Sequence, residues 1–181
     1  FMTKMMATNL ALYQAGEGVS ASGVFYQAGS PYSIIASPFE AGWRCPTGSG
    51  ITGGLIIAVL LFSKRDDFKA IAKLAIPCGI FNINEPIIFG IPMVMNPMFA
   101  VPFFLAPIAC ASLGYLVQYL GLCPLFVISV PWTTPVGLFG FLASSGNIMG
   151  GIWQAVIIIA ASTLIYTPFV IASNRQKEVA A

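Results

Sequence analysis

The 181-residue sequence contains no histidine, and only 8% of its residues are charged. Without histidine, the chain lacks the Ser-His-Asp and Cys-His arrangements of nucleophilic catalysis. Soluble domains usually carry about 25% charged residues. Hydrophobic residues make up 57% of the chain, which is more apolar surface than a soluble core of this size can bury. The sequence therefore predicts an integral membrane protein.

Cysteine is also scarce, and its placement argues against structural or metal chemistry. The four cysteines lie far apart without a CxxC pair: Cys45, Cys78, Cys110 and Cys123. They lie mostly within apolar runs, which favours buried hydrophobic thiols, and no histidine is present to complete a metal site. We therefore expect no disulfide framework, no metal and no cofactor. The net charge of +2 is too small to indicate nucleic acid as a partner.

The apolar pattern predicts an all-α fold of transmembrane helices with re-entrant, proline-broken segments. At about 20 residues per span, the length allows about four to six membrane-embedded segments. We divide the chain into residues 1–46, 47–174 and 175–181. The first part is expected to hold a short helix near residues 3–15 and an irregular connection. The second is the membrane-embedded, substrate-binding region, and the third is a tail.

Within the membrane region, two stretches are predicted to cross as regular helices, residues 106–122 and 149–173. Residues 87–108 form a proline-punctuated apolar tract, and residues 125–142 are split by the sequence PWTTP. Proline removes a helix donor and disfavours helix in the residue before it. We therefore expect broken or re-entrant elements at these two places.

The charges predict an orientation. The only strongly charged loop is SKRDDFKAIAK, residues 63–73, and Arg175 and Lys177 follow the last apolar stretch. Basic residues accumulate in short cytoplasmic loops. We expect a multi-pass protein of the plasma membrane, with residues 63–73 and the C-terminus in the cytoplasm.

Glu85 stands out because it is the only Asp, Glu, Lys or Arg between Leu74 and Asn174. An unpaired carboxylate in apolar surroundings is costly, and intramembrane acids commonly mark binding sites. The alternative is a structural glutamate paired with a backbone amide or an asparagine. Asn82 and Asn84 add amide donors and acceptors beside it, and nearby prolines free backbone groups that only protein or a water-filled cavity can cover.

The segment FNINEPIIFGIPMVMNP, residues 81–97, closely resembles the most characteristic segment of the IIC permease subunit in the lactose/cellobiose (diacetylchitobiose) family of bacterial phosphotransferase systems. The lead-in LAIPCGIFNINEP, then PFFLAPI, VPWTTP and IYTPF, follow in the same order. The resemblance covers most of the chain from Thr47 onward. It implies that this chain is the C-terminal part of a longer permease.

The resemblance also implies a function and a set of site residues. It places Glu85 near the 6-hydroxyl of the sugar, with hydroxyl-binding or pocket-shaping positions at Asn82, Asn84, Trp132, Thr133 and Thr134. It implies uptake of a β-disaccharide such as cellobiose, chitobiose or lactose. A partner IIB subunit with a phosphocysteine would phosphorylate the sugar, and the full-length protein would be a homodimer in the lipid bilayer.

Other interpretations stay open at this point. The main alternative is a proton-coupled secondary transporter that uses Glu85 as the proton-binding carboxylate, and a truncated product without activity of its own is a third possibility. The resembled family also uses an upstream histidine that this chain does not contain. For Trp132, the alternative to a sugar platform is an anchor at the membrane interface.

Overall fold

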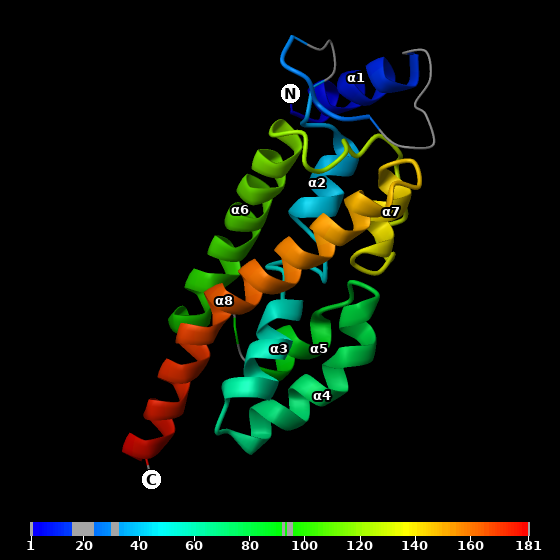
Figure 1. Cartoon of the computed structure of the whole chain (residues 1–181). Coiled ribbons are helices and arrows are strands. Elements are labelled where there is room, and N and C mark those ends of the chain that lie inside the picture. The colour runs from blue at the N-terminus through cyan, green and yellow to red at the C-terminus, as the bar shows by residue number, and fades with distance from the viewer. Residues whose placement is uncertain (1, 16–23, 30–32, 92, 94–95, 181) are drawn as a thin grey trace.

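The computed structural model describes residues 2–15, 24–29, 33–91, 93 and 96–180 (Figure 1). Within these ranges every regular element is a helix and no strand is found, as the sequence predicts. The helices are α1 (Met2–Ala15), α2 (Ser37–Trp43), α3 (Gly53–Phe62), α4 (Asp66–Ile80), α5 (Glu85–Gly90), α6 (Pro97–Tyr119), α7 (Leu138–Ala143) and α8 (Ile148–Ala180).

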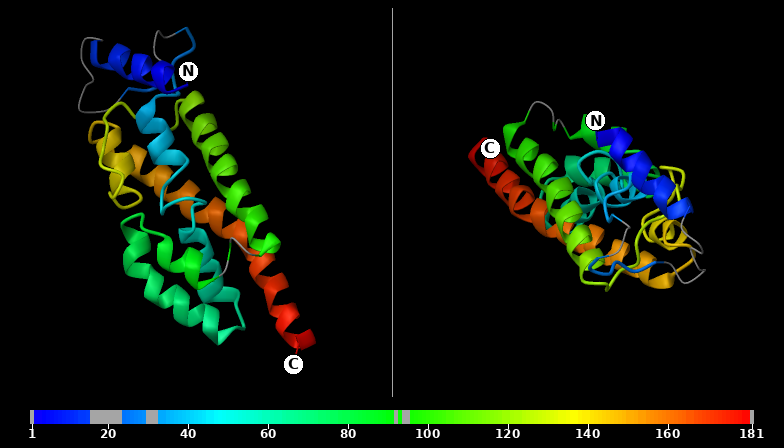
Figure 2. Two further views of the ribbon diagram at one scale, coloured as in Figure 1. Left: turned by 180° about the vertical axis from the view of Figure 1, so that it is seen from behind. Right: turned by 90° about the horizontal axis from the view of Figure 1, so that it is seen from above.

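Among the described residues, α6 and α8 are the two helices long and apolar enough to cross a membrane. They pack against each other and run along the long axis of an elongated molecule (Figure 2). Large apolar side chains remain exposed on both, including Phe104 at 68% and Leu164 at 72%. Apolar side chains exposed in such numbers suit contact with lipid or with further protein. The expected span over residues 149–173 lies within α8.

The tract over residues 87–108 is interrupted as expected, because α5 ends at Gly90 and α6 begins at Pro97, but the prolines inside α6 do not break that helix. Pro97 stands in the first turn, where a helix needs no N–H donor. Pro102 and Pro107 lie inside the helix, and each removes one backbone hydrogen bond. Neighbouring helices and local adjustments can satisfy the freed carbonyls of such helices. The span therefore begins at Pro97 and not at residue 106.

Helices α2 and α3 follow each other down the molecule and are separated by a central loop, residues 44–52 (Figure 1). With ten residues, α3 is too short to cross a membrane, which takes about 20. The loop turns through left-handed backbone at Thr47, Gly48, Gly50 and Ile51. Side chains fix this turn: the Thr47 hydroxyl accepts from Gly53 N at 2.9 Å, and the Thr52 hydroxyl donates to Thr47 O at 3.0 Å.

Two segments enter the helical body from opposite ends and turn back near its middle (Figure 1). The first is α4, a tip at residues 81–84, and the returning α5. The second descends without regular structure from residue 124 to a tip at residues 131–137, and returns as α7. The second tip contains the PWTTP sequence, so the break predicted there is confirmed. Each hairpin ends inside the molecule, as a re-entrant element does.

Glycines let α2 approach its neighbours closely. Trp43 is fully buried and stacks on Phe126, with ring centroids 5.3 Å apart and an interplanar angle of 2°. A Cβ on Gly114 of α6 would lie 2.3 Å from the Trp43 ring, and one on Gly42 would lie 2.6 Å from Phe126. These contacts fix α2, and therefore the start of the central loop, against α6.

Candidate functional site

The central loop and the two tips meet at Asn82. Its backbone has φ of 64°, a left-handed conformation that asparagine tolerates better than most residues. Its side-chain oxygen accepts from Thr47 N of the central loop at 2.6 Å. Its amide nitrogen donates to Thr134 O of the second tip at 3.0 Å, and also to Trp132 O. One buried side chain therefore ties the three chain breaks together.

Asn84 makes a second link between the first tip and the central loop. It is buried and donates from Nδ2 to Ser49 O at 2.7 Å. Gly48, with φ of 84°, lies directly against it, and a Cβ there would come within 2.4 Å of Asn84 Cγ. On the other side, the Tyr166 hydroxyl of α8 donates to Gly50 O at 2.7 Å. The central loop is thus held from both sides.

A cavity of 420 Å³ opens beside this junction, and we call it the Glu85 cleft. Its volume falls in the range of about 300–1,000 Å³ that small-molecule sites occupy. The tips contribute Asn82, Asn84, Glu85 and Trp132. Helix α2 and the central loop contribute Ser37, Glu40, Ala41, Arg44, Cys45, Gly48 and Ser49.

Glu85 begins α5 and its side chain is exposed to the cleft. In the part of the chain that the structure describes, it makes neither a hydrogen bond nor an ion pair. The structural alternative, a glutamate paired with an asparagine or a backbone amide, therefore has no contact to support it. The carboxylate is left with its full capacity to accept hydrogen bonds from a ligand.

Glu40 and Arg44 bring two charges to the cleft that were not expected in the site. They lie one helical turn apart and form an ion pair. Both residues line the same cleft as Glu85. The spacing of Glu and Arg in FEAGWR was the signal in the sequence, since residues four apart share a helix face. Only the fold shows that this face borders Glu85.

The remaining predicted residues are placed differently from one another. Trp132 lines the cleft and is 65% exposed, so its ring is open to a ligand. Thr133 and Thr134 do not line it. Thr134 takes part through its backbone, accepting from Asn82 and donating from its N–H to Pro131 O at 3.0 Å. Because both N–H donors of Asn82 are taken by backbone carbonyls, its contribution to the cleft is one of shape.

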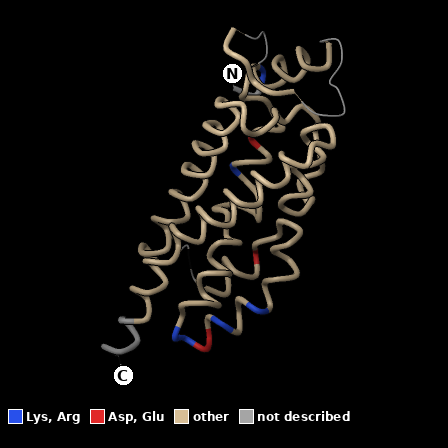
Figure 3. Tube along the Cα trace, in the orientation of Figure 1, with Lys and Arg blue, Asp and Glu red and all other residues tan. Residues whose placement is uncertain are grey.

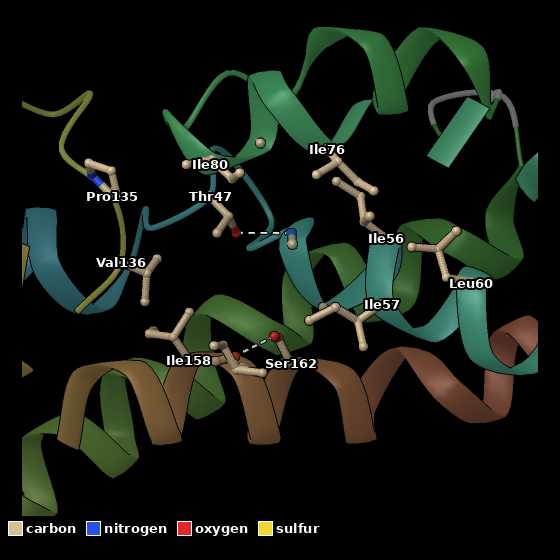
Figure 4. A pocket seen from close by; sticks show the side chains of 14 residues that line it. Thr47, Ile56, Ile57, Leu60, Ile76, Ile80, Pro135, Val136, Ile158 and Ser162 are labelled. Carbon is tan, nitrogen blue, oxygen red and sulfur yellow. Dashed lines mark hydrogen bonds between the residues drawn. The ribbon is translucent and has the colours of Figure 1, made fainter. Parts of the chain in front are cut away.

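A second cavity, the apolar cavity, has a volume of 360 Å³ and lies between α3, α4 and α8 (Figure 4). Isoleucines from all three helices point into it, among them Ile57, Ile76 and Ile158. Its two hydroxyl-bearing residues are already engaged: Thr47 donates to Pro46 O at 2.6 Å, and Ser162 donates to Ile158 O. This cavity therefore has few free hydrogen-bonding groups to replace the water that sugar hydroxyls lose on binding.

The described residues contain no group of three or more His, Cys, Asp or Glu side chains that could hold a metal ion. Cys45 lines the Glu85 cleft, and burial raises the pKa of its thiol, an effect that the Arg44 charge partly offsets. A raised pKa leaves little thiolate at neutral pH. The arrangement is suited to binding a neutral, hydroxyl-rich ligand by hydrogen bonds and an aromatic face.

Comparison with known proteins assigns the family. The sequence profile described as "Phosphotransferase system, EIIC" matches residues 1–107. The chain belongs to the phosphotransferase-system EIIC family. It is 41% identical over 135 residues to the cellobiose-specific EIIC component of Lactococcus lactis subsp. lactis (strain IL1403), covering 72% of this chain and 26% of that relative. It is 39% identical over 161 residues to the lichenan permease IIC component of Bacillus subtilis (strain 168), covering 88% and 35%.

A solved structure agrees with the sequence comparisons. The chain is similar to the transporter ChbC, the IIC component of an N,N'-diacetylchitobiose-specific phosphotransferase system, with a TM-score of 0.78 and 35% identity. The match covers 96% of this chain and 39% of that one. This EIIC chain is therefore a membrane protein of the same fold, as the resemblance implied. It spans about a quarter to two-fifths of the length of these relatives.

Proposed function

We propose that this EIIC chain forms the sugar-binding part of a phosphotransferase-system permease that takes up a β-linked disaccharide of the cellobiose, chitobiose or lactose class. The observation that carries the proposal is the Glu85 cleft. It joins an unpaired carboxylate, a charged pair and an exposed indole where three chain breaks meet. Broken helices around a central site are a recurring architecture for transporters.

In this proposal the residues have distinct roles. Glu85 accepts hydrogen bonds from sugar hydroxyls, and Trp132 stacks on the apolar face of a sugar ring. Asn82 and Asn84 shape the site by holding the tips against the central loop. Thr134 acts through its backbone carbonyl, which accepts from Asn82 at 3.0 Å, and Thr133 lies beside it in the second tip. No residue of the chain takes up the phosphoryl group: a IIB partner carries it as a phosphocysteine and transfers it to the sugar.

The proposed orientation places residues 63–73 and the end of α8 in the cytoplasm. The fold supports their lying on one side, because Asn174 accepts from Lys64 N at 2.8 Å and donates to Phe62 O at 2.9 Å. The basic residues of this loop gather at the end of the molecule where α8 finishes (Figure 3). Basic residues near short loops favour the cytoplasmic side. We further propose that the complete permease is a multi-pass homodimer.

Reconstitution tests the function. The permease that contains this segment is placed in proteoliposomes, with radiolabelled cellobiose outside and phosphorylated IIB enclosed inside. The proposal predicts phosphorylated cellobiose in the lumen only when IIB is supplied. Accumulation of unmodified cellobiose driven by a proton gradient, without IIB, would instead support a proton-coupled transporter. Impermeant labelling of a cysteine placed at Lys69 tests the orientation, since labelling from outside would contradict it.

A further inference from the structure

A third cavity adjoins the Glu85 cleft and is not part of the site assigned so far. It has a volume of 510 Å³ and lies on the side of the central loop that faces α6. Three residues line both this cavity and the Glu85 cleft: Arg44, Cys45 and Ser49. Only this wall separates the two spaces. We call the third one the phenylalanine cavity.

Its lining combines an aromatic floor with a few polar groups. Phe103 and Phe104 of α6 meet edge to face, with ring centroids 5.7 Å apart. Pro107, Ile108 and Ala111 extend this apolar surface along the same helix. The polar groups are Arg44 and Ser49 on the shared wall. Ser112 on α6 also lines the cavity, but its hydroxyl donates to Ile108 O at 2.8 Å. An apolar surface with a small number of convergent polar groups is the usual make-up of a small-molecule site.

The aromatic floor is fixed relative to the Glu85 cleft. A Cβ on Gly50 would lie 2.2 Å from the Phe103 ring, so that ring is in close contact with the central loop. The same loop is bonded to Asn84 through Ser49 O and to Tyr166 through Gly50 O. A ligand that extends across the wall would therefore meet two surfaces whose spacing the loop sets.

Arg44 has the donors to serve both spaces. It uses one guanidinium nitrogen in the ion pair with Glu40, while a guanidinium offers five N–H donors in total. The pair with Glu40 holds the group at the wall. A lipid chain could also cover Phe104, but it would offer no acceptor to the guanidinium donors that the ion pair does not use.

We propose that the phenylalanine cavity accommodates the second sugar residue of the disaccharide, with Phe104 offering its ring face and Arg44 donating at the junction between the two residues. The proposal rests on the function proposed above, in which the first residue lies beside Glu85. It makes Phe104 and Arg44 determinants of selectivity for a disaccharide over a monosaccharide. Glu40 is a positioning residue that acts through Arg44.

The test compares two probes in the purified permease, cellobiose and methyl β-glucoside, by calorimetry. Removing the Phe104 ring lowers the affinity of a ligand that packs on it. Phe104→Ala should therefore weaken cellobiose binding about tenfold. It should change the binding of methyl β-glucoside, which has no second sugar residue, less than about twofold. Phe89→Ala is the matched control, because Phe89 is 77% exposed and lines none of these cavities. It should change neither affinity.

A labelling experiment reads the same cavity without removing an aromatic ring. Ser112→Cys, in a background with Cys45→Ala, places a thiol in the phenylalanine cavity. Cellobiose should slow its reaction with a maleimide, whereas methyl β-glucoside should not. Equal weakening of both probes by Phe104→Ala, unchanged cellobiose binding, or a Ser112→Cys thiol that cellobiose leaves unprotected would overturn the inference. If the unaltered permease binds neither probe, the proposed function itself fails.

Discussion

Residues of the central loop line both the Glu85 cleft and the apolar cavity, which differ little in volume, at 420 and 360 Å³. In the cleft, the Glu85 carboxylate and the Trp132 ring face open space. In the apolar cavity, the hydroxyls of Thr47 and Ser162 are turned into backbone carbonyls. The comparison teaches that the state of the polar groups, and not the size of the space, distinguishes the proposed sugar site from the apolar cavity.

The largest expected effect comes from the hydrogen bonds by which Asn82 joins the central loop to the two tips beside the Glu85 cleft. Asn82→Asp keeps the acceptor for Thr47 N but removes both donors to the second tip. Two part-buried carbonyls then lose their donors and face the new carboxylate, at a cost of up to about 1–3 kcal/mol each. We expect the variant to lose several kcal/mol of stability, seen as a lower Tm in detergent and a smaller monodisperse fraction. A Tm equal to that of the unaltered protein would contradict the role of Asn82.

Gly48→Ala should have the next largest effect. A Cβ at this position meets both a left-handed backbone and the Asn84 side chain, 2.4 Å away. Left-handed backbone costs a non-glycine residue about 1–2 kcal/mol, and the clash adds to it. Gly29→Ala is the matched control, because its φ is 86° and nothing lies within 4 Å of the added Cβ. We expect a clearly larger drop in Tm for Gly48→Ala, and equal drops would show that the clash is relieved without cost.

Trp132→Ala sharpens the comparison within the cleft. The indole is 65% exposed, so its loss should leave the fold intact while removing the stacking face. We expect sugar affinity to fall by about 1–3 kcal/mol, the range for burying a large apolar side chain. Calorimetry on the folded variant measures this. Unchanged affinity would return Trp132 to the role of an anchor at the membrane interface.

The smallest effect concerns the Cys45 thiol on the wall of the cleft. Because burial raises its pKa, the thiolate fraction is small at pH 7 and should still be rising above pH 8.5, the usual thiol range. The alkylation rate of Cys45 should climb across this interval, and bound disaccharide should slow it. A rate that reaches half of its maximum at or below about pH 8.5, the value of a free thiol, would contradict the raised pKa.

Local sequence signals predicted much of the fold. The apolar run over residues 149–173 and the PWTTP break correspond to α8 and the second tip. The prolines inside α6 gave a wrong prediction. A proline interrupts one segment but is tolerated in a helix whose freed backbone carbonyls are satisfied by neighbouring groups. Whether a proline ends a helix depends on its surroundings, which a single sequence does not contain.

The site was harder to predict than the fold, because the residues that form it are far apart along the chain. Glu85 was recognisable because it is an isolated charge in an apolar region. Its neighbours across the cleft, Glu40 and Arg44, are about 40 residues away, and the Asn82 bonds join positions 35 and 50 to 52 residues apart. Such contacts follow from how the hairpins meet. From the sequence, the side-chain amide of Asn82 was expected to bind sugar hydroxyls or to shape the pocket. In the fold, its oxygen and nitrogen form hydrogen bonds with backbone groups.

The central claim is that the sugar binds in the Glu85 cleft and not in the apolar cavity. Calorimetric affinity for cellobiose tests it most directly, measured for Glu85→Gln and, as the matched change in the apolar cavity, for Leu60→Ala. A hydrogen bond to a charged group contributes about 1.5–3 kcal/mol, so Glu85→Gln should bind about tenfold or more weakly while staying monodisperse. Leu60→Ala should lower Tm and leave affinity unchanged. Full affinity in a well-folded Glu85→Gln variant, or a selective loss of affinity in Leu60→Ala, would contradict the account.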